Sequence, residues 1–279
     1  MSSRSLRRWS PLAAGVAVAA AGLAFSAMVP ADAGPGHHGN GHGHHAQSHR
    51  LSHVFIIMLE NHSKGDVVGD PDMPYTTHLA HRYAQATNYY GVTHPSEPNY
   101  IAATSGSTWD TNDDDGWNSG DDYPRDTDTG GNHYPHRNIV DQLEANHIRW
   151  AAYMESMPEA GYLPDDWPEE DTGLDPLYES KHNPFILYND IRSDPQRRSR
   201  IRPYDQMAHD LDSRHAPRYV WITPNLCNDL HGGVGTKIPG YENTPCPYGD
   251  AINQDEPENQ LQQNADEFVR QAVRTIKHS

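Results

Sequence analysis

The stretch HVFIIMLEN, residues 53–61, indicates the fold class more clearly than any other part of the chain. Its apolar part, His53 to Leu59, shows no polar alternation, which is typical of a strand buried on both faces of a parallel sheet. Glu60 and Asn61 follow at once, so this strand would present a carboxylate and an amide at its carboxyl end. Ligands gather at that end of parallel sheets, which makes both residues candidate metal ligands.

Helical and strand-like segments alternate along the chain after residue 51. Helices are expected over residues 76–87, 97–105, 138–147 and 259–277, and further strands over residues 148–154 and 218–223. This alternation predicts an α/β fold of three layers with a mainly parallel central sheet. Glu155 and the turn Thr223-Pro224-Asn225 follow strands as Glu60 does, so we expect them at the same edge of the sheet.

The segment THPSEPNY, residues 93–100, supplies a hydroxyl group to complement the first strand. Ser96 lies between Pro95 and Pro98, just before the predicted helix 97–105. Backbone N–H groups at a helix N-terminus lack partners within the helix and favour an approaching anion. A metal, a serine and such an anion site together point to hydrolysis of a phosphate or sulfate ester.

The first 33 residues have the features of an export signal. Arg4, Arg7 and Arg8 precede an apolar stretch over residues 12–28, and Ala31-Asp32-Ala33 is a small-residue cleavage site. We therefore expect a secreted protein, with export by the twin-arginine route left open and a retained membrane anchor as the alternative. Elsewhere the sequence has no apolar run of the roughly 20 residues that a spanning helix needs, so no stable membrane anchor is expected.

Residues 34–50 are rich in glycine and histidine and have no apolar periodicity. The segment holds His37, His38, His42, His44, His45 and His49. This composition predicts a disordered linker that serves as a solvated tether, with loose binding of transition metals through imidazole as the alternative. The folded domain is then expected over residues 51–279.

The balance of charges limits the partners of the protein. The 279 residues carry a formal net charge of −17 at pH 7. Nucleic acid is excluded as a partner because phosphate backbones are bound by basic surfaces. An acidic surface instead suits a secreted enzyme that holds divalent cations.

Cys227 and Cys246 are the only cysteines of the chain. In an oxidising compartment two cysteines at this separation are expected to form a disulfide, which would stabilise the fold by about 3 kcal/mol. Two free thiols or two unrelated metal ligands are the alternatives.

The segment between Asp110 and Asp128 is crowded with aspartates. Asp110, Asn112, Asp114 and Asp121 have the spacing of a calcium loop. Gly116 falls one position late for that motif, and the closing acid is aspartate rather than glutamate. A solvated surface loop is therefore favoured.

Five motifs in order resemble a known family. They are HVFIIMLENHS (53–63), THPSEPNYIAATSG (93–106), WAAYMESMP (150–158), KHNPF (181–185) and ITPNLCNDLHGG (222–233). Together they resemble the bacterial phosphoesterase family of acid phosphatases and non-specific phospholipases C, within the alkaline-phosphatase-like superfamily. The resemblance spans residues 52–278 and implies an alkaline-phosphatase-like fold and a phosphate-ester substrate, either a small phosphomonoester or a phospholipid headgroup.

The resemblance also implies roles for individual residues. A divalent metal ion of unknown identity would be held by Glu60, Asn61 and Ser96. Ser96 would be the nucleophile, and Asn99 would hydrogen-bond a phosphoryl oxygen. The remaining catalytic residues would be His182 and His231, which face the phosphate, and Asp229, which orients His231.

The end of the chain departs from the family pattern. In this family a helix like 259–277 leads into another strand, whose tip gives the metal a pair of acidic residues, and a further histidine follows. Because this chain ends at Ser279, we expect a partial, C-terminally truncated domain with impaired activity. The apolar face of the last helix would then lack cover; it consists of Leu261, Phe268, Val269, Ala272, Val273 and Ile276.

The motifs leave two alternatives to phosphate-ester hydrolysis. A sulfatase-like hydrolase is disfavoured because Tyr100 stands where the sulfatase frame has arginine. A catalytically impaired remnant that acts as a secreted metal-binding protein is the alternative from a different class.

Overall fold

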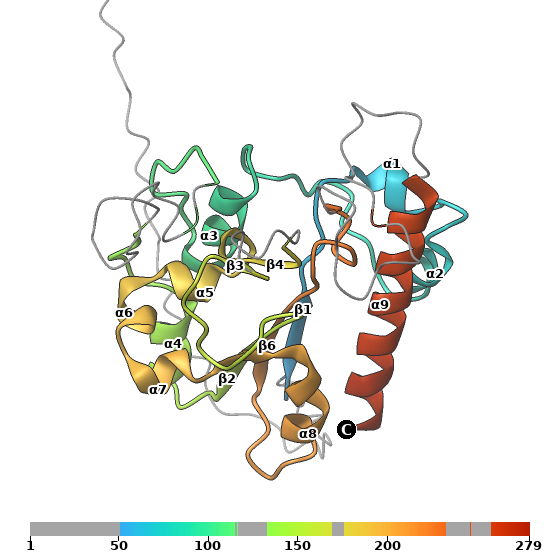
Figure 1. Cartoon of the computed structure of the whole chain (residues 1–279). Helices are drawn as coiled ribbons and strands as arrows, with labels where there is room; N and C mark the ends of the chain where they lie inside the picture. The colour runs from blue at the N-terminus through green and yellow to red at the C-terminus, as the bar shows by residue number, and fades with distance from the viewer. Residues whose placement is uncertain (1–50, 115, 117–132, 169–175, 233–245, 247–257) are drawn as a thin grey trace, which may run out of the picture. The chain divides into compact units, whose positions relative to one another are not determined.

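The computed structural model describes residues 51–114, 116, 133–168, 176–232, 246 and 258–279 (Figure 1). The predicted export signal and linker, residues 1–50, lie outside these ranges, as does Asp121 of the candidate calcium loop. No helix among the described residues combines the length and the apolar character needed to cross a membrane.

Within the described part of the chain, four parallel strands form the central sheet. In the order in which they lie side by side, they are β1 (Val54–Ile57), β6 (Tyr219–Thr223), β2 (Trp150–Met154) and β5 (Ile201–Pro203). Both pairs that involve β6 are parallel, with Val220 opposite Phe55 on one side and Ala151 on the other. The predicted mainly parallel sheet is therefore confirmed. Strands β3 (Asp166–Trp167) and β4 (Tyr178–Glu179) form a separate antiparallel pair.

The helices connect these strands. The α-helices are α1 (Lys64–Val67), α2 (Pro74–Arg82), α3 (Glu97–Ser105), α4 (Ile139–Ala145), α5 (Pro184–Leu187), α6 (Asn189–Arg192), α7 (Pro195–Arg198), α8 (Met207–Leu211) and α9 (Glu258–His278). Two short 3-10 helices complete the described elements, η2 (Ser180–His182) and η3 (Tyr204–Gln206).

The sheet separates two apolar cores, as a three-layer fold requires. Trp150, Ala152 and Met154 of β2 face one core, which α3, α4, α5 and α6 cover. Ala151 and Tyr153 face the other, which contains residues of α8 and α9. Successive side chains of a strand point to opposite faces, so an unbroken apolar strand is needed when both faces are covered.

Helix α9 corrects one expectation. Its apolar face was expected to lack cover, but Leu261, Phe268, Val269 and Ala272 are buried and Val273 and Ile276 are half-buried. Phe268 and Ala272 pack against Val220 and Ile222 of the sheet. The expectation was wrong because residues already described cover this face: the sheet covers Phe268 and Ala272, and Met73 and Leu230 pack with Leu261.

Local signals fixed several element boundaries well. Helix α3 has the predicted bounds, and Asn138 caps α4 by accepting a hydrogen bond of 2.9 Å from the Val140 N–H. Helix α2 begins earlier and ends earlier than predicted. An acid from α9 caps its start: Asp266 accepts hydrogen bonds from the N–H groups of Tyr75 and Thr76 at 2.9 and 2.7 Å.

Two further predictions concern the first strand and the cysteines. Strand β1 is only partly buried, contrary to the expectation for its apolar run, because it lies at the edge of the sheet among the described strands. Cys227 and Cys246 form a disulfide, which confirms the predicted pairing.

Candidate active site

The site lies where strands β1 and β6 end. Glu60 follows β1, and its N–H donates a hydrogen bond of 2.6 Å to the carbonyl oxygen of Asp229, which follows β6. His182 ends η2, and its carbonyl oxygen accepts a hydrogen bond of 3.1 Å from the Thr223 hydroxyl at the end of β6. The carboxyl edge of the sheet therefore gathers three chain segments that are distant in sequence, as predicted for parallel strands.

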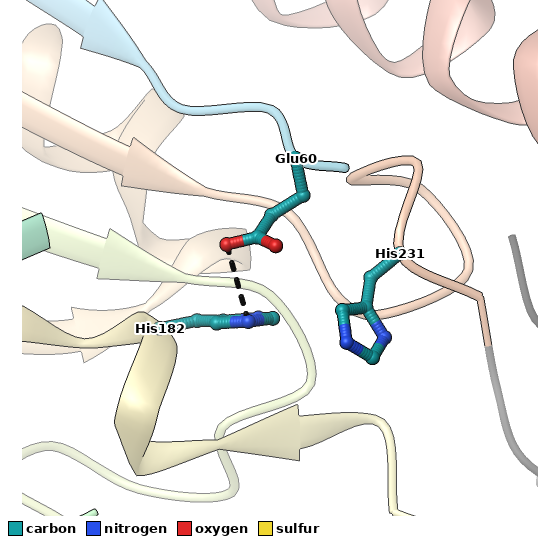
Figure 2. Close-up of side chains that lie close together, drawn as sticks. All are labelled: Glu60, His182 and His231. Atoms are coloured by element: carbon teal, nitrogen blue, oxygen red, sulfur yellow. Dashed lines mark ion pairs between the residues drawn. The ribbon is translucent and has the colours of Figure 1, made fainter. Parts of the chain in front are cut away.

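A chain of four polar side chains connects these segments. The Ser96 hydroxyl donates a hydrogen bond of 2.7 Å to Oε2 of Glu60. Oε1 of Glu60 lies 3.2 Å from Nε2 of His182, the contact drawn in Figure 2. Nδ1 of His182 lies 3.2 Å from Oδ2 of Asp229. Glu60, His182 and Asp229 are buried, so these contacts act at low effective dielectric.

The two carboxylates determine the charge of His182. Burial alone would lower the pKa of its imidazole, but the charges of Glu60 and Asp229 outweigh burial and raise that pKa to about 9. Burial likewise favours a higher pKa for Glu60, but the positive charge of His182 and the hydrogen bond from Ser96 hold it below its ordinary value. Near neutral pH the metal-free site therefore contains an imidazolium beside an ionised Glu60.

The first turn of α3 differs from the predicted anion site. The N–H of Glu97 donates a hydrogen bond of 2.7 Å to Oδ1 of Asp114, and the N–H of Asn99 bonds to the carbonyl oxygen of Ser96 at 2.9 Å. Pro98 has no N–H to offer. The expectation of free N–H groups is therefore wrong for this turn, because an acid from the following loop already caps it.

Asn99 was predicted to contact a phosphoryl oxygen, but its amide bonds to the backbone just before Ser96. Its Oδ1 accepts from the N–H groups of Val92 at 2.7 Å and Thr93 at 3.3 Å. Its Nδ2 donates to the carbonyl oxygens of Thr93 at 2.8 Å and Pro95 at 2.9 Å.

Asp229 was predicted to orient His231, and the structure gives it a wider role. Its Oδ1 accepts a hydrogen bond of 2.7 Å from the backbone N–H of His231, while its Oδ2 faces the ring of His182. Nδ1 of His231 lies 3.0 Å from the carbonyl oxygen of Gly232. A carbonyl oxygen can only accept, so Nδ1 carries the proton in this contact.

Three of these side chains form a candidate metal site. Glu60, His182 and His231 each offer one ligand atom, and these atoms lie within 4.8 Å of one another (Figure 2). Among the described residues, Nε2 of His182 makes no hydrogen bond of acceptable geometry, although Oε1 of Glu60 is close. One carboxylate and two imidazoles fit a first-row divalent cation such as Zn²⁺.

The metal set predicted from the sequence overlaps with this cluster only at Glu60. Asn61 is exposed and has a φ of 51°, a left-handed conformation that asparagine tolerates. Ser96 contacts the cluster through Glu60. Metal ligation by Asn61 and Ser96 therefore stays a prediction.

Tyr100 was not predicted as part of the site. Its ring stacks on that of His182 with centroids 5.3 Å apart and an angle of 13° between the planes. Burial and the charge of Glu60 raise the pKa of its hydroxyl well above its ordinary value, so the phenol stays neutral. The spacing could have revealed it, because Tyr100 follows Ser96 by one helical turn and shares its face of α3.

Parts of the chain are similar in sequence to a known protein family and to named phosphatases. Residues 70–239 match the sequence profile of the Phosphoesterase family. The chain is 34% identical over 177 residues to a probable acid phosphatase of Kluyveromyces lactis, an alignment that covers 63% of this chain and 38% of that protein. An acid phosphatase of Aspergillus fumigatus is 33% identical over 181 residues, or 65% of this chain and 37% of that protein.

A relative of lower sequence identity is named for a specific substrate. A phosphatidylinositol-3-phosphatase of Mycobacterium tuberculosis is 24% identical over 183 residues, covering 66% of this chain and 52% of that protein. The chain thus spans less than two fifths of the length of the two fungal relatives and about half of the mycobacterial one.

Proposed function

The chain belongs to the Phosphoesterase family, and on that premise we propose that it is a secreted, metal-dependent phosphatase in which Ser96 attacks phosphorus. The observation that carries this proposal is the hydrogen bond of 2.7 Å from the Ser96 hydroxyl to Oε2 of the ionised Glu60. The names of the relatives favour phosphate monoesters over sulfate esters and over the diesters that a phospholipase C cleaves.

The side chains of the site would share the chemical steps. Oγ of Ser96 forms a bond to phosphorus as the bond to the ester oxygen breaks, and its proton passes to Glu60. His182 holds Glu60 from the side opposite Ser96. Because the Nδ1 proton of His231 is engaged by the Gly232 carbonyl oxygen and its other ring nitrogen is a candidate metal ligand, the leaving oxygen takes its proton from water. A second water then releases phosphate from Ser96.

Glu60, His182 and His231 would hold the divalent cation, with His182 as a neutral imidazole. A bound cation would neutralise charge on the phosphoryl oxygens and strengthen the nucleophile. Secretion is supported by the leader-like first 33 residues and by the disulfide between Cys227 and Cys246.

The test compares alanine variants of two serines: Ser96 at the N-cap of α3, and Ser105 at the end of the same helix. Ser96→Ala should lower the turnover of p-nitrophenyl phosphate by at least about a thousandfold, because it removes the nucleophile. Ser105→Ala is the matched control, since the Ser105 hydroxyl bonds to the Ile101 carbonyl oxygen in the same helix. Acid-quenched wild-type protein should carry a phosphoryl group on Ser96, and EDTA should abolish turnover until a divalent cation is added back.

Three results would contradict the proposal. Turnover of Ser96→Ala within about tenfold of wild type would remove Ser96 as the nucleophile. Full activity after metal removal would refute metal dependence. A wild-type chain that binds Zn²⁺ yet does not hydrolyse p-nitrophenyl phosphate would support the metal-binding alternative instead.

A further inference from the structure

The amide of Asn99 is fully used by the loop that leads to Ser96. A primary amide has two N–H donors and two acceptor lone pairs. Both donors bond to the carbonyl oxygens of Thr93 and Pro95, and the oxygen accepts from the N–H groups of Val92 and Thr93. These partners also fix which end of the amide is oxygen, since the N–H groups need an acceptor and the carbonyls need donors.

The Asn99 amide has no free donor left for a phosphoryl oxygen. Such an oxygen would need a donor from Nδ2, and both of its N–H groups are already engaged, at 2.8 and 2.9 Å. Binding phosphate through Asn99 would therefore break a bond to the loop and leave a backbone carbonyl oxygen unsatisfied, which costs free energy.

The loop also packs closely on the amide. A Cβ atom placed on Gly91 would lie 3.2 Å from Oδ1 of Asn99, tighter than an ordinary contact. Glycine at this position thus lets the backbone approach the amide. The contact gives a second way to disturb the same arrangement without changing Asn99.

We propose that Asn99 is a positioning residue, which clamps residues 92–95 to the first turn of α3 and so fixes Ser96 against Glu60. The inference rests on the proposed function only in naming Ser96 as the nucleophile; the clamp itself stands on the hydrogen bonds. The hydrogen bond of 2.7 Å from the Ser96 hydroxyl to Glu60 forms only if the backbone just before Ser96 keeps one conformation, and the Asn99 amide holds that backbone. A displacement of about 1 Å from the reacting geometry can lower a rate by about 100-fold.

Three variants test the clamp. Asn99→Ala removes all four bonds, Asn99→Asp keeps the acceptor but loses both donors, and Gly91→Ala pushes a methyl group against Oδ1. Asn146→Ala is the matched control, because the Asn146 amide also bonds to backbone, donating to the Gln142 carbonyl oxygen at 2.8 Å at the end of α4. The measurements are amide hydrogen exchange, the single-turnover rate constant for phosphorylation of Ser96, and competitive inhibition by inorganic phosphate.

The clamp predicts a distinct pattern. In Asn99→Ala the amides of Val92 and Thr93 should exchange about fivefold faster or more, and Asn99→Asp should restore most of that protection. The phosphorylation rate constant should fall by about 10- to 100-fold in Asn99→Ala and less in Gly91→Ala, while phosphate inhibits with a constant within about twofold of wild type. A rate constant from single turnover does not depend on the fraction of folded protein, so a purely structural loss would leave it unchanged.

Two results would overturn the proposal. Unchanged protection of Val92 and Thr93 in Asn99→Ala would show that the amide does not hold the loop. A phosphate inhibition constant that rises in step with the loss of rate would make Asn99 a phosphoryl contact. If Ser96→Ala left turnover unchanged, the proposed function would fail. Amide exchange at Val92 and Thr93 would still show whether Asn99 holds the loop.

Discussion

The charge of His182 depends on two neighbouring carboxylates. Its imidazole has a pKa of about 9 in the folded metal-free protein against 6.5 for an unperturbed histidine, because Glu60 and Asp229 outweigh the effect of burial. A basic group with a raised pKa stabilises the fold fully below the lower value and loses that contribution as pH rises through the higher one.

Stability of the metal-free protein should therefore fall between pH 6.5 and about 9. The decline should reach at most about 1.4 kcal/mol per pH unit, the limit for one proton. Urea unfolding in EDTA across this range measures it. His182→Gln should remove the decline, whereas His209→Gln, at a side chain that is 91% exposed, should leave it unchanged. An equal slope in His182→Gln would contradict this account.

At the scale of elements, Glu155 couples the end of strand β2 to the turn after β6. Its N–H donates to the Thr223 carbonyl oxygen at 2.9 Å. Its carboxylate accepts from the Asn225 N–H at 2.9 Å and from the Asn228 amide at 3.0 Å. Burial raises the pKa of Glu155 above its ordinary value, and these two hydrogen bonds offset only part of that rise. The turn that Glu155 holds continues directly into Asp229.

Glu155→Gln should loosen this turn. The amide oxygen could replace Oε2, which accepts from both Asn225 and Asn228, but the NH2 group would then take the place of Oε1 and face the Asn228 NH2 group. This contact between two donors should cost about 1–3 kcal/mol in the free energy of unfolding. Hydrogen exchange at the Asn225 amide should accelerate, and turnover should fall because Asp229 and His231 follow the turn. Glu159→Gln, an exposed position shortly after, is the control. Wild-type exchange at Asn225 in Glu155→Gln would argue against this role.

At the scale of the whole molecule, helix α9 closes one face of the sheet. Phe268 is 6% exposed and lies in the same core as Val220 and Ile222 of β6. The centroid of its ring lies 4.9 Å from the centroid of the Tyr204 ring. The helix also reaches back to the start of α2 through Asp266, so it joins elements almost 200 residues apart in sequence.

Phe268→Ala should lower the free energy of unfolding by about 3–5 kcal/mol, because it removes a buried ring and leaves a cavity. Tyr89→Ala is the matched aromatic control; Tyr89 is 80% exposed, so its loss should change stability by less than about 0.5 kcal/mol. Chemical unfolding followed by circular dichroism measures both. Equal stabilities of the two variants would mean that α9 does not seal this core in solution.

The sequence alone determined the elements that depend on local signals. The apolar runs predicted strands β1, β2 and β6, and the proline in the first turn marked the start of α3. Placing Glu60 at a strand end and Ser96 at a helix start required only these local rules. Strand β5 escaped prediction because three residues, one of them a proline, carry no readable periodicity.

Only the tertiary structure decided which side chains meet. The sequence gives no sign that Asp229 faces His182, that Asp114 caps α3, or that the Asn99 amide turns back on the loop before it. The family resemblance predicted that His182 and His231 face the phosphate; only folding showed that both also lie beside Glu60, as a group able to hold a cation. Hydrogen-bond partners are chosen by distance and direction in three dimensions, and spacing along the chain constrains neither between separate elements.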